Sequence, residues 1–112
     1  MPLNPETQLP LSLADYLLSH LAQECAEVIV RATKAQHFGL NEVQPEQEHT
    51  NAARVTHEWC DLLATMETLQ EYGILPELPR SEYIQRKNEK RGKAALFREY
   101  SRNLERLVGG ES

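Results

Sequence analysis

Two pairs of acidic residues stand out in this 112-residue sequence, because their types and spacing could do chemistry. Glu24 and Glu27 lie in the segment ECAE, and Glu58 and Asp61 lie in the segment EWCD. In a helix, a spacing of three residues places both side chains on the same side, with Cβ atoms about 5–6 Å apart. Like charges at this spacing disfavour an isolated helix by a few tenths of a kcal/mol. Because the pattern occurs twice despite this cost, it indicates that the acids have a function.

Each pair borders the apolar face of a predicted helix. At about 100° per residue, the first helix gathers on one face Leu13, Leu17, Leu21, Cys25, Val28, Ala32 and Ala35. Glu24 lies within this face and Glu27 lies on its edge. The corresponding face of the second helix holds Val55, Trp59, Leu62, Leu63, Met66 and Leu69. Glu58 lies on its border with Asp61 beside it, so both pairs lie next to the predicted core.

Antiparallel packing of the two apolar faces would turn both pairs into one cleft. Four carboxylates in a partly desolvated cleft repel one another, so protons or cations must neutralise them. Mg²⁺ prefers carboxylate oxygen and commonly takes substrate phosphates as its remaining ligands. The pattern thus predicts a magnesium site, with Mn²⁺ as the alternative ion. The competing interpretation is a solvated helix, in which Glu27 pairs with Arg31 at a spacing of four residues.

The predicted elements are all helical, since no run alternates apolar and polar residues between turns. Residues 1–11 contain three prolines and predict an extended arm, and Ser12 with Asp15 predicts a helix start. The first helix should end near His37, before Gly39. A polar loop over residues 39–50 leads to a second helix, from about Asn51 to Tyr72. The predicted fold class is therefore all-α, a small bundle built on two long antiparallel helices.

Two shorter helical segments are expected to follow. Ser81 is the predicted cap of a segment that runs to about Arg91, and Gly92 is expected to break or kink the chain. A fourth segment covers about residues 94–107. We assign residues 12–108 to one all-α domain and residues 109–112 to a flexible tail, because the chain is too short for two independent cores.

Composition limits the function classes. The chain is 40% hydrophobic and 26% charged, as is ordinary for a soluble globular protein. No apolar run approaches the roughly 20 residues of a membrane span, and the N-terminus lacks a signal-peptide pattern, which predicts a cytoplasmic protein without a membrane partner. A net charge of −5 argues against nucleic acid as the main partner. Cys25 and Cys60 are interpreted as small buried residues.

With these residues in place, the chain resembles the MazG-like, all-α nucleoside triphosphate pyrophosphohydrolases. Their hallmark is Glu-x-x-Glu on one helix and Glu-x-x-Asp on the next, matched here by Glu24, Glu27, Glu58 and Asp61. The resemblance covers most of residues 13–105. Two features depart from the family pattern: the connection between the pairs is long, and the usual double Glu at the start of the first motif is Gln23–Glu24.

The resemblance implies that the four acids ligate Mg²⁺. A nucleoside triphosphate, NTP or dNTP, would be hydrolysed to the monophosphate and pyrophosphate by a metal-oriented water, with one carboxylate as its base. Lys87 and Arg91 match a Lys and Arg pair that contacts phosphates in the family, and Lys34 is a further candidate. Their alternative is a solvated basic face within RKNEKRGK, residues 86–93. Family members form dimers or tetramers, and the wide apolar faces also predict a homo-oligomer.

Other functions fit the sequence less well. A di-iron bundle needs Glu-x-x-His on two helices, and the sequence has this spacing only at Glu46 and His49, in a Pro-containing loop. A zinc site built from Cys25, Cys60, His20 and His57 lacks paired spacing. The main rival is a non-catalytic helical module that binds nucleotide or another protein.

Trp59 is expected to pack in the core, and Phe38 is a weaker candidate for base stacking.

Overall fold

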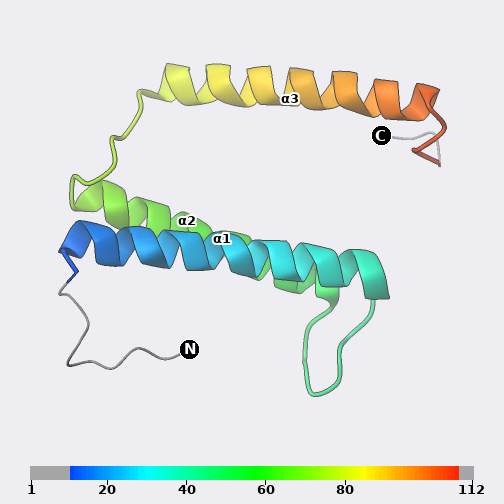
Figure 1. Ribbon diagram of the computed structural model, residues 1–112, viewed down its shortest axis with the longest axis horizontal. Coiled ribbons are helices and arrows are strands. Elements are labelled where there is room, and N and C mark those ends of the chain that lie inside the picture. The colour runs from blue at the N-terminus through cyan, green and yellow to red at the C-terminus, as the bar shows by residue number, and fades with distance from the viewer. Residues whose placement is uncertain (1–10, 109–112) are drawn as a thin grey trace. The chain divides into compact units, whose positions relative to one another are not determined.

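A computed structural model describes residues 11–108, and these residues form three helices and no strand (Figure 1). The helices are α1 (Leu13–Phe38), α2 (Asn51–Glu71) and α3 (Arg80–Asn103). The predicted all-α class is therefore confirmed. None of the three combines the length and the hydropathy that crossing a bilayer requires. Nearly all of the predicted arm and the whole predicted tail lie outside the described residues.

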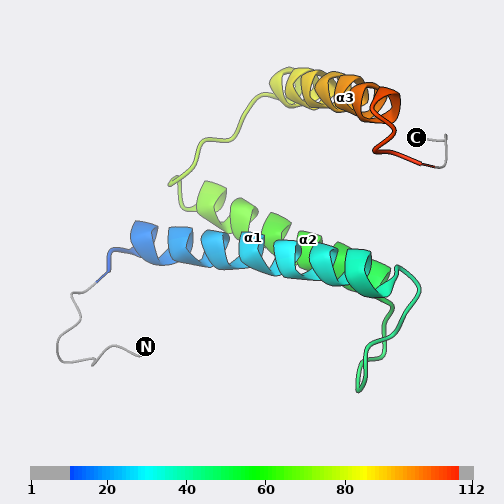
Figure 2. The same ribbon diagram turned by 45° about the vertical axis from the view of Figure 1, so that its right-hand side comes forward.

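The described residues fall into two compact units, which divide between Pro76 and Glu77. In the first unit, α1 and α2 lie side by side and run antiparallel, as both views show (Figures 1 and 2). The second unit consists of α3 and the residues that flank it. Each unit is described below by itself.

Helix α1 begins and ends where its sequence predicts. The Ser12 hydroxyl accepts a hydrogen bond from the Asp15 backbone N–H at 3.1 Å, which satisfies one of the free amides of the first turn. At the other end, Gly39 has a φ of 103° and donates its backbone N–H to the Ala35 carbonyl. This left-handed conformation favours glycine, which has no Cβ to clash.

The loop between α1 and α2 is fastened to the first turn of α2. The Asn51 side chain is 2% exposed, and its amide donates to the Gly39 carbonyl oxygen at 2.9 Å. The Asn51 backbone N–H donates to the Glu42 carbonyl, and that of Ala52 donates to the Leu40 carbonyl. Thr50 caps the Ala53 amide through its hydroxyl. The loop thus supplies acceptors to successive amides that α2 leaves free.

Helix α3 is one continuous helix, which corrects the expectation of two shorter segments separated at Gly92. A helical glycine costs about 1 kcal/mol relative to alanine but does not itself end a helix. The flanking residues, with Lys93, Ala94 and Ala95 on the C-terminal side, favour the helix and outweigh that cost. The start also differs: Pro79, with an extended ψ of 147°, precedes the helix and makes no side-chain cap, so Ser81 lies inside α3 rather than at its cap.

The buried surface is smaller than the predicted apolar faces. Ala35 and Leu69 are the only buried hydrophobic side chains among residues 11–108. Trp59 is 54% exposed, and both cysteine side chains are exposed, so the expectations of a core tryptophan and of buried thiols are wrong for this fold. The physical reason is geometric: one neighbouring helix covers only a narrow stripe, and the predicted faces are wider than that stripe.

Candidate metal centre

Three of the four predicted acids converge at the contact between α1 and α2. Glu24 of α1 and Glu58 and Asp61 of α2 each offer a carboxylate oxygen, and the three oxygens lie within 4.8 Å of one another. Glu24 and Glu58 are partly buried, whereas Asp61 is exposed. The group is therefore assembled from two helices and is open to solvent on the side of Asp61.

Helical spacing explains why these acids meet. Apart from His20, the less exposed residues of α1 recur every three or four positions: Ala14, Leu17, Leu21, Glu24, Val28, Arg31 and Ala35. This stripe faces α2, and Glu24 occupies one of its central positions. On α2, the corresponding stripe holds Val55, Glu58, Leu62, Met66 and Leu69. Asp61 follows Glu58 by three residues, so it lies on the same side of α2 one turn further along.

Glu27, the fourth predicted ligand, does not join the group. Its side chain is exposed, and the set of mutually close oxygens contains Glu24, Glu58 and Asp61 without it. The contact stripe of α1 passes through Glu24 and Val28, which leaves Glu27 on its outer edge. The edge position predicted from the sequence is thus observed, but the structure does not bring this carboxylate to the other three.

An arginine lies beside the acidic group. The Nε of Arg31 is 3.8 Å from Oε1 of Glu58, and the two side chains are 17% and 21% exposed. The Nε and Nη1 atoms of Arg31 are buried and have no hydrogen-bond partner. The expected alternative was a pair between Arg31 and Glu27 along α1. The ion pair instead crosses from α1 to α2, and it leads to a member of the acidic group.

Sequence reasoning did not assign Arg31 to the site, although a signal was present. Arg31 follows Glu24 by seven residues, which is close to two full turns and returns to the same face of α1. An acid and an arginine at this spacing, both inside an otherwise apolar stripe, indicate a polar cluster at the contact between helices.

The predicted phosphate-binding residues are all exposed. Lys34 lies on α1, one turn beyond Arg31, while Lys87 and Arg91 lie on α3, in the other unit. Arg91 follows Lys87 by four positions, so the two residues share one side of the helix as predicted.

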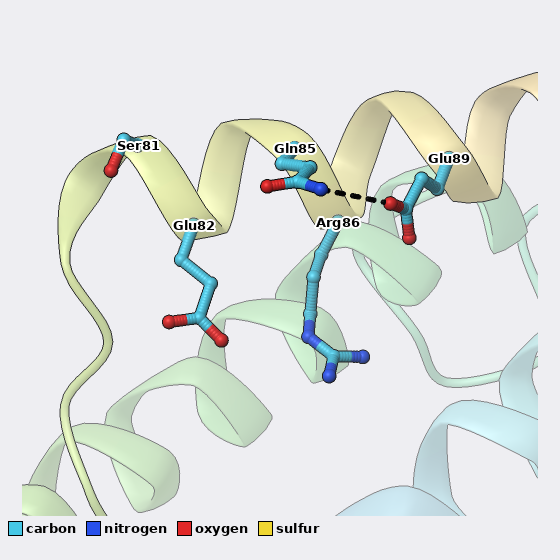
Figure 3. Close-up of a pocket in the computed structure, with 5 residues that line it drawn as sticks. All are labelled: Ser81, Glu82, Gln85, Arg86 and Glu89. Atoms are coloured by element: carbon cyan, nitrogen blue, oxygen red, sulfur yellow. Dashed lines mark hydrogen bonds between the residues drawn. The ribbon is translucent and has the colours of Figure 1, made fainter.

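The first turns of α3 line a shallow pocket with side chains of both charges, from Ser81, Glu82, Gln85, Arg86 and Glu89. Glu82 and Arg86 lie on the same side of the helix, and Gln85 donates to Glu89 Oε1 at 3.2 Å (Figure 3). The two acids outnumber the single cation, so this pocket is not suited to an anion.

The donor set fits a hard cation. All three ligand atoms are carboxylate oxygens, which suit Mg²⁺ or Mn²⁺ better than the softer metals that prefer thiolate or imidazole. Within residues 11–108, this is the one group of three or more potential ligands, and it contains neither Cys nor His. The rings of His49 and His57 lie 4.9 Å apart, but no third ligand joins them in that part of the chain.

Comparisons with known proteins identify no relative. No family model matches the chain, and no match was found among curated proteins or solved structures.

Proposed function

We propose that the protein is a Mg²⁺-dependent nucleoside triphosphate pyrophosphohydrolase, which converts an NTP or dNTP to the monophosphate and pyrophosphate. The observation that supports this proposal is the convergence of the Glu24, Glu58 and Asp61 carboxylates from two helices within 4.8 Å. The spacing of these acids also resembles the motifs of the MazG-like family. An acidic group of this kind would repel a triphosphate unless a cation lay between them.

Glu24, Glu58 and Asp61 are the residues that would hold the cation. Once bound, Mg²⁺ would stabilise charge on the phosphate oxygens and orient the attacking water. Glu24 and Glu58 are partly buried and fixed by the helix contact, so they would define the position of the site. Because Asp61 is exposed, its carboxylate is our candidate for the base that accepts a proton from water on the open side.

We further propose that basic side chains hold the phosphate tail. Lys34 is the candidate within the first unit, and Lys87 and Arg91 are the candidates on α3. Arginine can bind two phosphate oxygens with its planar fork, while lysine contributes a compact charge. Any of these contacts would offset part of the negative charge of the triphosphate.

We also propose that the protein acts as a homo-oligomer, a dimer or a tetramer. Large apolar side chains remain exposed on both long helices of the first unit, including Ile29 at 65% and Trp59 at 54%. Soluble monomers rarely leave wide apolar patches uncovered. The same surface is the feature that favours the alternative function, a non-catalytic module that binds nucleotide or another protein.

Turnover assays separate the enzyme from the module. The full chain is incubated with Mg²⁺ and a panel of canonical and modified NTPs and dNTPs, and pyrophosphate and monophosphate are measured. We expect release with at least one substrate, loss of release with EDTA, and loss with Glu58→Gln. Glu67→Gln, an exposed acid of α2 outside the group, is the matched control and should retain activity. No release from any substrate, or full activity of Glu58→Gln, contradicts the proposal.

A further inference from the structure

Arg31 is a cation held inside the helix contact next to the acidic group. Its side chain is 17% exposed, and two of its three guanidinium nitrogens are buried without a hydrogen-bond acceptor. Buried donors in proteins nearly always have a partner, so unpaired ones call for a physical explanation. The acid beside them is Glu58, whose Oε1 lies 3.8 Å from Nε, just beyond hydrogen-bond range.

The distance and burial suggest a supporting contact rather than a surface ion pair. Exposed pairs are screened by water and hold neither side chain in place. Here both partners are more than three-quarters buried, and the pair joins α1 to α2. A carboxylate has two oxygens, so Glu58 can face Arg31 with one oxygen and a cation with the other.

The charge balance around Arg31 also indicates that it supports the acidic group. When ionised, Glu24, Glu58 and Asp61 carry three negative charges at close range, and their repulsion opposes the packing of α1 on α2. Arg31, Lys34 and Arg54 are the only lysine or arginine residues between positions 11 and 76. Of these cations, Arg31 alone forms an ion pair among the described residues. Arg31 therefore offsets part of the repulsion before any metal ion is present.

We infer that Arg31 is a positioning residue of the proposed metal centre, which holds the Glu58 carboxylate in place and balances the acidic group in the metal-free protein. This inference rests on the proposed function. Outer partners that orient metal-binding carboxylates contribute roughly 10–100-fold to metal affinity. Arg31 itself would not touch the metal.

Equilibrium binding of Mn²⁺ to the full chain, followed by electron paramagnetic resonance, tests the inference without turnover. We expect Arg31→Gln to weaken binding by roughly 10–100-fold. Arg31→Lys keeps the charge without the planar fork and should bind Mn²⁺ more tightly than Arg31→Gln. Arg54→Gln is the matched control: it removes the same charge one turn before Glu58 and should leave the affinity close to that of the unmodified chain.

A double-mutant cycle in EDTA adds a second readout. Arg31→Gln should lower the melting temperature of the metal-free chain, and its effect should shrink in the Glu58→Gln background, because the two side chains act on each other. Circular dichroism confirms that each variant remains helical; if Arg31→Gln does not, the comparison uses Arg31→Lys, which should still bind Mn²⁺ less tightly than the unmodified chain.

The outcomes are distinct. If the unmodified chain does not bind Mn²⁺, the proposed function and the inference both fail. If the chain binds Mn²⁺ but Arg31→Gln, or Arg31→Lys where that variant replaces it, binds equally well, the inference alone fails. Independent effects of Arg31→Gln and Glu58→Gln in the cycle would likewise overturn the positioning role.

Discussion

The Asn51 side chain links the start of α2 to the end of α1, since its amide donates a hydrogen bond to the Gly39 carbonyl oxygen at 2.9 Å. Gly39 is the residue that ends α1, and Asn51 is the first residue of α2. The same amide nitrogen lies 3.3 Å from Oε1 of Glu42. One buried side chain therefore fixes where the second helix starts relative to the end of the first.

Replacing this side chain should destabilise the hairpin. Asn51→Ala removes the donor and leaves the Gly39 carbonyl oxygen without it, which should lower the free energy of unfolding by about 1–3 kcal/mol. Urea denaturation followed by circular dichroism measures the change. Asn41→Ala, an exposed asparagine of the same loop, is the control and should change stability little. Equal effects of the two substitutions would show that the Asn51 contact is not stabilising.

The acids of the first helix should differ in importance. Glu24→Gln removes a member of the converged group, so it should weaken Mn²⁺ binding by more than the roughly 10–100-fold expected for an outer partner. Glu27→Gln changes an exposed carboxylate outside that group and should have a clearly smaller effect. Titration with Mn²⁺ measures both. A loss with Glu27→Gln as large as with Glu24→Gln would restore the four-ligand arrangement expected from the sequence.

Two glycines should respond oppositely to alanine. Gly92 lies inside α3, and a Cβ added there would meet no atom within 4 Å, so Gly92→Ala should stabilise the helix by about 0.5–1 kcal/mol. Gly73 has a φ of 71°, and Gly73→Ala should destabilise the end of α2 by about 1–2 kcal/mol, because this conformation is strained for alanine. Thermal unfolding of both variants tests the contrast, which fails if the two shifts have the same sign.

Self-association should depend on the exposed apolar surface of the hairpin. Ile29→Asp places a charge on a side chain that is 65% exposed in the single chain, and burying that charge at an interface would be costly. We expect the dimer or tetramer to dissociate at least about tenfold more readily, as measured by sedimentation velocity. Val43→Asp changes an exposed residue of the loop and serves as the control. A monomeric unmodified chain at all concentrations would refute the oligomer.

The basic residues of α3 should affect substrate rather than metal. Combining Lys87→Ala with Arg91→Ala should raise KM for the triphosphate by about tenfold or more, since each charge-assisted contact contributes roughly 1.5–3 kcal/mol. Binding of Mn²⁺ should stay unchanged. Lys93→Ala, also on α3, is the comparison and should leave KM nearly constant. An unchanged KM in the double variant would assign both residues to a solvated basic face.

Local signals in the sequence predicted much of the hairpin. Ser12 and Gly39 mark the limits of α1 because a cap hydroxyl and a left-handed glycine act over one turn. The convergence of Glu24 with Glu58 and Asp61 followed from periodicity once antiparallel packing was assumed. By contrast, the break expected at Gly92 is wrong, because α3 continues through this residue. The cost of one glycine is smaller than the helix preference of its neighbours, and a glycine alone does not reveal that balance.

Other features depended on tertiary contacts that periodicity does not contain. Trp59 and Cys25 belong to apolar faces that one partner helix covers only in part, so they remain exposed. The pairing of Arg31 with Glu58 rather than Glu27 depends on the side of α1 that meets α2. The spacing of four residues along α1 favoured a pair with Glu27, but the packing of α1 on α2 places Glu58 beside Arg31 instead.

The scarcity of buried apolar side chains has a calorimetric consequence. The heat-capacity increment of unfolding rises with the apolar area that becomes hydrated. For the monomer, this increment should therefore be below the roughly 12–15 cal/mol/K per residue typical of globular proteins. Scanning calorimetry at increasing chain concentration would then report how much surface is sequestered by partners. A larger increment in concentrated samples would measure the part of the interior that neighbouring copies provide.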